Sequence, residues 1–373
     1  MKQNKVPDMS TRTFPEEANL LVTGGSGFIG ANFIRFVLEK TNFRGKIVNA
    51  DKLTYAGNPE NLKDMEEHYG DTRYVFEKTD ICDPAAVKAL FARHDIDIVV
   101  HFAAESHVDR SISGPADFIN TNIIGTFNLL EAVREQWDHR RDVLFHHIST
   151  DEVYGSLPED RPEAKFFETT AYDPRSPYSA SKASSDHLVK AYYHTYGIPV
   201  TLSNCSNNYG PYQFPEKLIP LMISNMLEEK SLPVYGDGKN VRDWLYVEDH
   251  CSGIWKILQE GERGGTYNIG GENEWTNIDL LQVLCEITAE ETGKDKEHYK
   301  KLITFVKDRA GHDRRYAINC DKIKNALGWQ QSVTFKEGLR KTVRWYLDNP
   351  EWIENVKTGE YRKWIEQNYT KRC

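Results

Sequence analysis

Three glycines at a fixed spacing constrain the fold of this 373-residue chain more than any other feature. Gly24, Gly27 and Gly30 directly follow an apolar run at residues 19–23, and an amphipathic run at residues 31–40 follows them. This order predicts a strand, a tight turn and a helix, because glycines let the backbone approach a phosphate group at a helix N-terminus. We therefore expect a dinucleotide-binding unit near the start of the chain.

The end of the second predicted strand indicates which dinucleotide is bound. Residues 46–51 form this strand, and Asp51 is its last residue. A carboxylate at this point suits the ribose hydroxyls of NAD and repels the extra phosphate of NADP. Lys52 weakens the preference slightly, but NAD is the expected cofactor.

Strands and helices then alternate. Further strands are predicted at residues 74–76, 96–102 and 143–149, and helices at residues 84–93 and 116–137. Such alternation is typical of βαβ units with helices on both faces of a parallel sheet. The predicted fold class is α/β, a Rossmann-type doubly wound parallel sheet with a smaller, partly discontinuous C-terminal substrate domain.

The chain after about residue 205 is richer in proline and turn signals. We expect a flexible N-terminal tail (1–18), an NAD-binding Rossmann domain (19–205), a mainly substrate-binding domain (206–350) and a C-terminal helical tail (351–373). A strand at 265–269 is expected to return to the large sheet, and residues 351–367 to form a surface helix. Further helices are predicted at residues 178–196, 277–292, 321–327 and 335–347.

Composition excludes several classes of protein. A net charge of −9 and a pI near 5.8 argue against nucleic-acid binding. The six cysteines are scattered and form no C-x-x-C pair, which is typical of reduced thiols. No apolar run has the length of a membrane span or of a signal-peptide core. We expect a cytoplasmic protein without a membrane partner.

Two short segments carry the candidate catalytic groups. Thr150, Asp151 and Glu152 follow the strand at residues 143–149, at the sheet edge where ligands bind. Tyr178 and Lys182 are four residues apart and share one face of a predicted helix. A lysine ammonium beside a phenol favours the phenolate, so we expect a lowered pKa for Tyr178. The two adjacent acids add a second acid/base pair, which indicates more chemistry than oxidation alone.

The histidines suggest a metal site only weakly. They offer no pair on one helix face together with a carboxylate ligand, and the expected chemistry needs no metal. We expect structural histidines and no metal.

The order of these motifs resembles the extended short-chain dehydrogenase/reductase family. Longer segments are similar to the dTDP-glucose 4,6-dehydratases within that family, and the resemblance covers roughly residues 19–350. These segments are residues 51–57, 101–109, 149–155, 206–212, 214–221, 235–238 and 242–244.

The resemblance implies roles for individual residues. Thr150 would hold the 4-oxygen of the sugar, Asp151 would be the acid, Glu152 the base, and Tyr178 with Lys182 would serve the redox step. The implied cofactor residues are Gly24, Gly27, Phe28, Ile29, Gly30, Asp51, Lys52, Leu53, Thr54, Asp80, Ile81, Ala103, Ala104, Ser106, Thr121, Tyr178 and Lys182. The implied substrate residues are Ser106, Thr150, Asn207, Glu216, Lys217, Leu218, Pro233, Tyr235, Arg242, Asn277, Arg309 and His312.

The implied reaction is a closed cycle in deoxysugar biosynthesis. Oxidation at C4 acidifies the C5 hydrogen, water is eliminated across C5 and C6, and the hydride returns to C6. The product would be a 4-keto-6-deoxy sugar nucleotide, with dTDP-glucose as the expected substrate. The predicted helix at residues 116–137 has apolar residues on more than one face, so one face can pack on the sheet and another is left to cover. Members of the family that the chain resembles pair two such helices, and the resemblance therefore implies a homodimer.

Several alternatives stay open. Asn204 stands where the resemblance implies an arginine, and Ala310 where it implies a proline. The resemblance therefore leaves open how the nucleotide part of the substrate is bound. A UDP-glucose 4,6-dehydratase, a nucleotide-sugar 4-epimerase and a non-catalytic NAD-sensing module are the rival functions. The sequence does not distinguish thymidine from uridine, nor does it identify the pathway.

Overall fold

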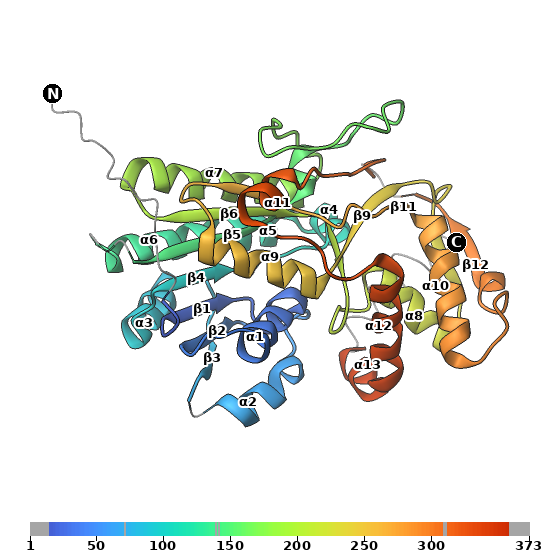
Figure 1. The fold of residues 1–373 in the computed structure, drawn as a ribbon, viewed down its shortest axis with the longest axis horizontal. Helices are drawn as coiled ribbons and strands as arrows, with labels where there is room; N and C mark the ends of the chain where they lie inside the picture. Colours follow the sequence, from blue (N-terminus) through green and yellow to red (C-terminus); the bar gives the residue numbers. More distant parts are fainter. Residues whose placement is uncertain (1–14, 71, 139, 141, 309–311, 358–373) are drawn as a thin grey trace.

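A seven-stranded parallel sheet forms the larger part of the molecule (Figure 1). The computed structural model describes residues 15–357 except 71, 139, 141 and 309–311. The strand order is β10-β6-β5-β4-β1-β2-β3, and every neighbouring pair in it is parallel. The predicted doubly wound α/β fold is therefore confirmed. The order reverses between β1 and β4, and ligands bind at such reversals in open α/β sheets.

Most of these strands begin and end within two residues of their predicted positions. Their bounds are β1 (Asn19–Thr23), β2 (Lys46–Asp51), β3 (Tyr74–Lys78), β4 (Ile98–His101), β5 (Leu144–Thr150), β6 (Val200–Cys205) and β10 (Thr266–Ile269). Strand β10 pairs with β6, so the predicted return of this segment to the large sheet is confirmed.

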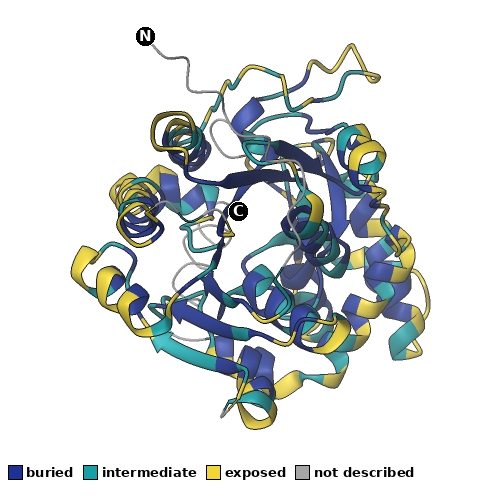
Figure 2. Cartoon of the chain, turned by 60° about the vertical axis from the view of Figure 1, so that its left-hand side comes forward, coloured by how far each residue is buried: buried dark blue, intermediate teal, exposed yellow. Residues whose placement is uncertain are grey.

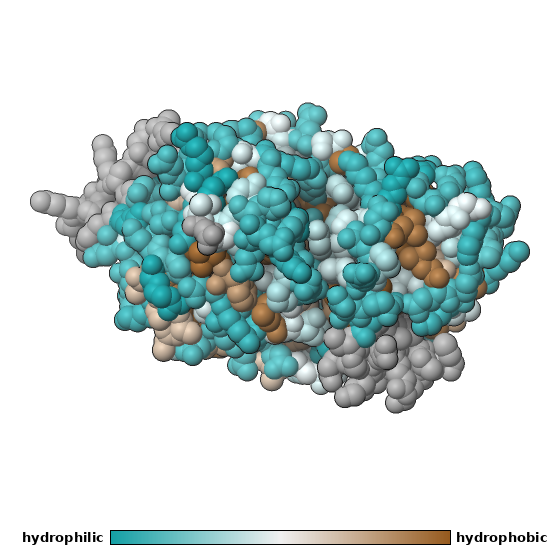
Figure 3. All heavy atoms as spheres, turned by 90° about the horizontal axis from the view of Figure 1, so that it is seen from below, coloured by the Kyte–Doolittle hydropathy of each residue, from teal (hydrophilic) through white to brown (hydrophobic). Residues whose placement is uncertain are grey.

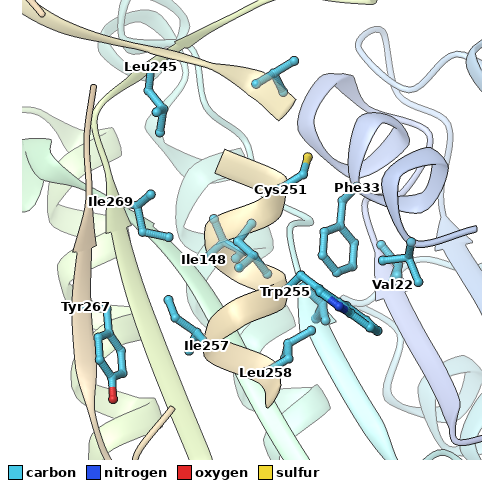
Figure 4. Close-up of a cluster of buried hydrophobic side chains, with 14 of the residues drawn as sticks. Val22, Phe33, Ile148, Leu245, Cys251, Trp255, Ile257, Leu258, Tyr267 and Ile269 are labelled. Carbon is cyan, nitrogen blue, oxygen red and sulfur yellow. The ribbon is translucent and has the colours of Figure 1, made fainter. Parts of the chain in front are cut away.

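Helices cover both faces of the sheet, as the buried strands and exposed outer helix faces in Figure 2 show. On one face lie α1 (Phe28–Lys40), α9 (Val247–Glu260) and α11 (Asp321–Leu327). Alternate strand residues such as Leu20 and Val22 pack against them, and Figure 4 shows Trp255, Ile257 and Leu258 of α9 in this cluster. On the other face lie α3 (Pro84–His94), α6 (Thr126–Gln136) and α7 (Pro177–Tyr196).

The long helix predicted at residues 116–137 is interrupted in the middle. It consists of α5 (Pro115–Phe118), a wide π-helical segment (Ile119–Gly125) and α6. The carbonyl oxygen of Asn122 in the wide segment accepts hydrogen bonds from the Thr126 and Ser185 hydroxyls, both at 2.6 Å. The Asn122 amide donates to the carbonyl of Glu105. The widened turn thus fixes the loop that follows β4.

The remaining elements enclose a separate hydrophobic cluster. One three-stranded sheet contains β7 (Asn207–Tyr209), β9 (Val241–Tyr246) and β11 (Glu274–Thr276), and a two-stranded sheet pairs β8 (Leu232–Tyr235) with β12 (Ile303–Val306). The helices here are α8 (Leu218–Leu227), α10 (Asn277–Thr292), α12 (Phe335–Asp348) and α13 (Pro350–Val356).

Helix α13 is the described part of the surface helix expected at residues 351–367, and only one of its faces is exposed. Trp352, Ile353 and Val356 of α13 are buried in this second cluster. The Trp352 indole also donates a 2.8 Å hydrogen bond to Asn61, which lies beside α1 in the larger part of the molecule. Helix α13 therefore joins the two parts. No helix among the residues described is long and apolar enough to cross a membrane.

Candidate active site

A cavity of about 300 Å³ opens at the strand reversal between β1 and β4. All but two of the expected cofactor residues lie on its wall. They are Gly24, Gly27, Phe28, Ile29, Gly30, Asp51, Lys52, Thr54, Ile81, Ala103, Ala104, Ser106, Thr121, Tyr178 and Lys182.

The glycine turn makes room for a phosphate group at the start of α1. Gly24 has a φ of +69°, and a Cβ there would lie 2.6 Å from the backbone nitrogen of Ala103. A Cβ on Gly30 would collide with the carbonyl oxygen of Gly24. Gly27 caps the helix without a side chain, so the first N–H groups of α1 face no capping oxygen. This cradle fits the pyrophosphate of a dinucleotide.

We predict that Gly30→Ala weakens NAD binding at least tenfold while the protein still folds, because the new methyl group pushes the turn away from the helix. Gly114→Ala is the matched control, since a Cβ at Gly114 has no neighbour closer than 3.8 Å. Calorimetric titration with NAD measures both. Equal affinities in the two variants would contradict the assignment of the cradle.

Asp51 is the last residue of β2 and lines the first cavity. Its carboxylate accepts hydrogen bonds from the N–H groups of Ser26 (3.1 Å) and Leu53 (2.8 Å), and burial raises its pKa. Lys52 is 3.7 Å from Asp80, which neutralises part of its charge. Leu53 and Asp80 themselves are absent from the wall of the cavity formed by the described residues. The glycine turn and the Asp51 carboxylate fit NAD, with the carboxylate suited to accept hydrogen bonds from the ribose hydroxyl groups.

A second cavity of about 170 Å³ adjoins the first. Seven residues line both cavities: Ser106, Glu152, Asn207, Asn208, Gln213, Glu216 and Lys217. The expected substrate residues on the second wall are Ser106, Asn207, Glu216, Lys217, Leu218, Pro233, Tyr235, Arg242, Asn277 and His312. Thr150 lines the first cavity, and Arg309 lies outside the described residues.

The second cavity is lined by charged groups held in fixed positions. The buried Glu216 carboxylate accepts from the Tyr55 hydroxyl (3.0 Å) and the Arg110 guanidinium (3.2 Å). Lys217 donates to the carbonyl of Ser106. Arg242 donates to the carbonyl of Asp313 and stacks on the Tyr316 ring at 4.3 Å. Such a site can bind a nucleotide through both its base and its phosphates.

The three catalytic candidates at the end of β5 occupy one turn. Thr150 caps a short 3-10 helix (Asp151–Tyr154), and its hydroxyl accepts from the N–H of Glu152 at 3.3 Å. Asp151 is 2 % exposed, and its Oδ2 has no hydrogen-bond partner among the described residues. Burial and the neighbouring Glu152 charge hold the pKa of Asp151 well above its usual value. Asp151 is therefore suited to donate a proton.

Tyr178 and Lys182 are placed by the start of α7. Ser176 and Ser179 form a capping box, and Pro177 occupies the first turn. These residues fix the start of the helix, and with it the positions of Tyr178 and Lys182. The Lys182 ammonium donates a 2.8 Å hydrogen bond to the carbonyl of Ile148. The expected low pKa of Tyr178 is wrong for this structure. Burial, then the charge of Glu152, raises the pKa of the phenol well above its usual value.

Other residues on the walls were not predicted. Gln213 and Asn208 line both cavities, and Trp244 and Tyr316 line the second. Asn204 is absent from both walls of the described site. Its amide donates a 3.1 Å hydrogen bond to the carbonyl of Thr150, so it supports the turn that carries the candidate residues. Gln213 sits in the aromatic and proline segment at 211–215, a signal that sequence inspection could have used.

The central histidines have hydrogen-bond partners. His101 lies between the hydroxyls of Thr23 (2.7 Å) and Thr126 (2.9 Å), and His146 between those of Thr201 and Ser203. Within the described part of the chain, no three His, Cys, Asp or Glu side chains are grouped to hold a metal ion.

The dinucleotide fold and the tyrosine–lysine pair define the class of extended short-chain dehydrogenases/reductases. A family model described as GDP-mannose 4,6 dehydratase matches residues 21–342. The dTDP-glucose 4,6-dehydratase 1 of Escherichia coli (strain K12) is 56% identical over 366 residues, which cover 95% of this chain and 99% of that protein.

Solved structures agree with this sequence match. The dTDP-glucose 4,6-dehydratase of Bacillus anthracis in complex with NAD has a TM-score of 0.80 and 47% identity, covering 91% of this chain and 100% of that chain. The dTDP-glucose 4,6-dehydratase of Streptomyces venezuelae with NAD and TYD bound has a TM-score of 0.81 and 43% identity at the same coverage. The chain belongs to the dTDP-glucose 4,6-dehydratase family.

Proposed function

We propose that the protein is an NAD-dependent hydro-lyase that converts dTDP-glucose into dTDP-4-keto-6-deoxyglucose. The observation that carries this proposal is the position of Glu152, which lines both the cofactor cavity and the second cavity. A sugar at this junction lies between the tyrosine–lysine pair and the buried Asp151. The relatives that share the fold and the sequence bear the same activity in their names.

The residues of this chain perform the proton transfers. Tyr178, with Thr150 beside it, takes the proton of the 4-hydroxyl group. Glu152 then takes the C5 proton, which the C4 ketone has made acidic. Asp151 gives its proton to the departing 6-hydroxyl group, which its raised pKa allows. When bound, NAD supplies the reversible hydride chemistry.

The nearest rival of the same fold is a 4-epimerase. An epimerase uses the tyrosine and lysine but has no use for an adjacent acid and base at the end of β5. The buried Asp151 favours the dehydratase, because a neutral carboxylic acid beside a second carboxylate is what elimination of a hydroxyl group requires.

One incubation tests the proposal. The purified protein and NAD are mixed with dTDP-glucose, and in parallel with UDP-glucose, and the products are followed by nuclear magnetic resonance. A 4-keto-6-deoxy product from dTDP-glucose at the higher kcat/KM supports the proposal. A galactose product identifies an epimerase, faster turnover of UDP-glucose identifies the uridine enzyme, and no product identifies a binding module.

We also propose the division of the chain into an NAD-binding domain at 19–205 and a mainly substrate-binding domain at 206–350. The separate hydrophobic cluster that contains α8, α10 and α12 supports it. A cytoplasmic location is proposed from the scattered cysteines. Those that the structure describes are all free thiols: Cys82, Cys205, Cys251, Cys285 and Cys320.

A homodimer is proposed from an exposed apolar surface on one side of the sheet. Ile112, Ile119, Ile124 and Phe127 are 40–49% exposed, and they follow one another along α4 (Val108–Ser113), the wide turn and α6. On the face shown in Figure 3, hydrophobic residues lie in small groups among hydrophilic ones. A second copy of the chain would cover this apolar surface.

We predict that Ile124→Arg halves the mass measured by light scattering at micromolar protein, because a buried unpaired charge breaks the interface. Phe305→Arg is the control, since Phe305 is 61% exposed on β12 and lies outside this surface. A monomeric wild-type protein would contradict the proposed dimer.

A further inference from the structure

Helix α7 carries a third ionisable residue on the face that holds the tyrosine and the lysine. Tyr178, Lys182 and Asp186 are spaced by four residues, so they lie one above the other along the helix. Asp186 is 0% exposed and lines neither cavity among the residues described. The mechanism above gives Asp186 no role. A fully buried carboxylate is unfavourable unless other groups pair with it or donate hydrogen bonds to it.

Only one oxygen of the Asp186 carboxylate is hydrogen-bonded among the described residues. Its Oδ2 accepts hydrogen bonds from the Ser149 hydroxyl (2.8 Å) and the Tyr172 hydroxyl (2.9 Å). Its Oδ1 lies 3.2 Å from Nε2 of His147, and the same Nε2 lies 3.4 Å from the Lys182 ammonium. The imidazole therefore stands between the two buried charges.

We propose that Asp186, acting across His147, is the positioning residue that keeps the Lys182 ammonium charged and in place beside Tyr178. This inference rests on the proposed function of the tyrosine–lysine pair. The tyrosine–lysine pair lies on the wall of the first cavity, and His147 and Asp186 continue from Lys182 into the interior of the protein.

The charges around Lys182 single out Asp186. Burial lowers the pKa of both His101 on β4 and His147 on β5 well below the usual value, so both rings are neutral. Burial raises the pKa of the Cys205 thiol on β6 to about 12, so it is neutral as well. Lys190 faces Asp186 from the next turn of α7. A buried ammonium without an anionic partner is strongly unfavourable. Burial raises the pKa of Asp186, whereas the charge of Lys182 and the hydrogen bonds from Ser149 and Tyr172 lower it, and this carboxylate supplies the negative charge.

The same arrangement sets the pH range in which Lys182 is charged. Burial lowers the pKa of Lys182 to about 8, and the charge of Asp186 opposes this effect. Because the ammonium is the active form, activity should fall as the pH rises through the pKa of Lys182. Removal of the Asp186 charge lowers that pKa further, so the fall in activity should begin at a lower pH.

The first test compares pH profiles of the NAD-loaded enzyme. In Asp186→Asn the alkaline limb of kcat should move to lower pH, and the ratio of variant to wild-type kcat should fall about tenfold per pH unit between the two midpoints. Tyr172→Phe is the matched control, because it removes a hydrogen bond to Asp186 without removing the charge. Its limb should stay in place, and Asp186→Glu should restore most of the wild-type limb.

The second test needs no turnover, so it fails or succeeds independently of the proposed reaction. Asp186→Asn leaves a buried ammonium unpaired, whereas Lys182→Met/Asp186→Asn removes both charges. The double variant should therefore melt at a higher temperature than Asp186→Asn.

Either of two results would overturn the proposal: an unmoved alkaline limb in a folded Asp186→Asn, or a double variant no more stable than Asp186→Asn. If Asp186→Asn does not fold and the double variant does, the charge pairing is supported directly.

Discussion

Tyr178→Phe should lower kcat by about 10³–10⁴-fold while the affinities for NAD and dTDP-glucose change little. In the proposed mechanism the Tyr178 phenolate is the base that accepts the 4-hydroxyl proton, and the substitution leaves that proton without an acceptor. The ring itself should stay in place, because it is 8% exposed and lies edge-on to Phe118 with the ring centroids 6.3 Å apart. Steady-state kinetics and calorimetric titration measure the two effects separately.

Tyr192→Phe is the matched control on the same helix. Tyr192 donates a hydrogen bond to Glu131 and is absent from both cavity walls among the described residues. Its variant should turn over like the wild type. Wild-type turnover in Tyr178→Phe would instead remove Tyr178 from the mechanism.

Because the pKa of Tyr178 is raised, Lys182 alone does not stabilise the phenolate sufficiently. Burial and the Glu152 charge disfavour the anion, and the ammonium of Lys182 is directed at the carbonyl of Ile148. A positive charge on a bound nicotinamide ring would favour the phenolate. Proton transfer is therefore expected only when both cavities are filled.

The regular elements were predictable where local signals mark both ends. Helix α10 begins after Thr276, whose hydroxyl accepts from the N–H of Asp279, and it ends at Gly293 with a φ of +67°. Helix α11 ends at Gly328 in the same left-handed conformation. The predicted bounds of both helices are those observed. A capping threonine and a glycine mark the two ends of α10, and a glycine marks the end of α11.

The features that were not predicted depend on distant parts of the chain. The wide turn at Ile119–Gly125 is stabilised by Ser185 on α7 and by the loop after β4. The burial of α13 depends on its packing against the second cluster and on Asn61. Periodicity within a segment cannot reveal such partners.

The site shows the same division. The candidate catalytic residues predicted from a strand end (150–152) and from one helix face (Tyr178 and Lys182) line the same cavity. Asn204 was noticed only as a departure from the resemblance, and its contact with Thr150 emerges from the pairing of β5 with β6. The raised pKa of Tyr178 was not predicted, since it depends on the burial of the phenol and on the charge of Glu152 from another segment.

Substrate deuterated at C4 should give product deuterated at C6, with no net release of NADH. The hydrogen that leaves C4 must return to the same sugar if oxidation and reduction form one closed cycle. In the proposed cycle Glu152 removes the C5 hydrogen as a proton, so the C5 hydrogen of the product should instead come from the solvent. Reaction in heavy water should therefore label C5, and nuclear magnetic resonance of the product reads both positions at once.

Two variants separate the steps of this cycle, each with an expected loss of about 10²–10⁴-fold in product formation. Glu152→Gln should oxidise C4 and stall, so NADH absorbance builds up on the enzyme without product. Asp151→Asn should slow elimination, because only the departing hydroxyl lacks its proton donor. Glu159→Gln is the control, since the Glu159 side chain is 67% exposed and pairs with Arg314. The C4 label decides: if it is lost to water or to free NADH, the cycle is open and the protein is a dehydrogenase rather than a dehydratase.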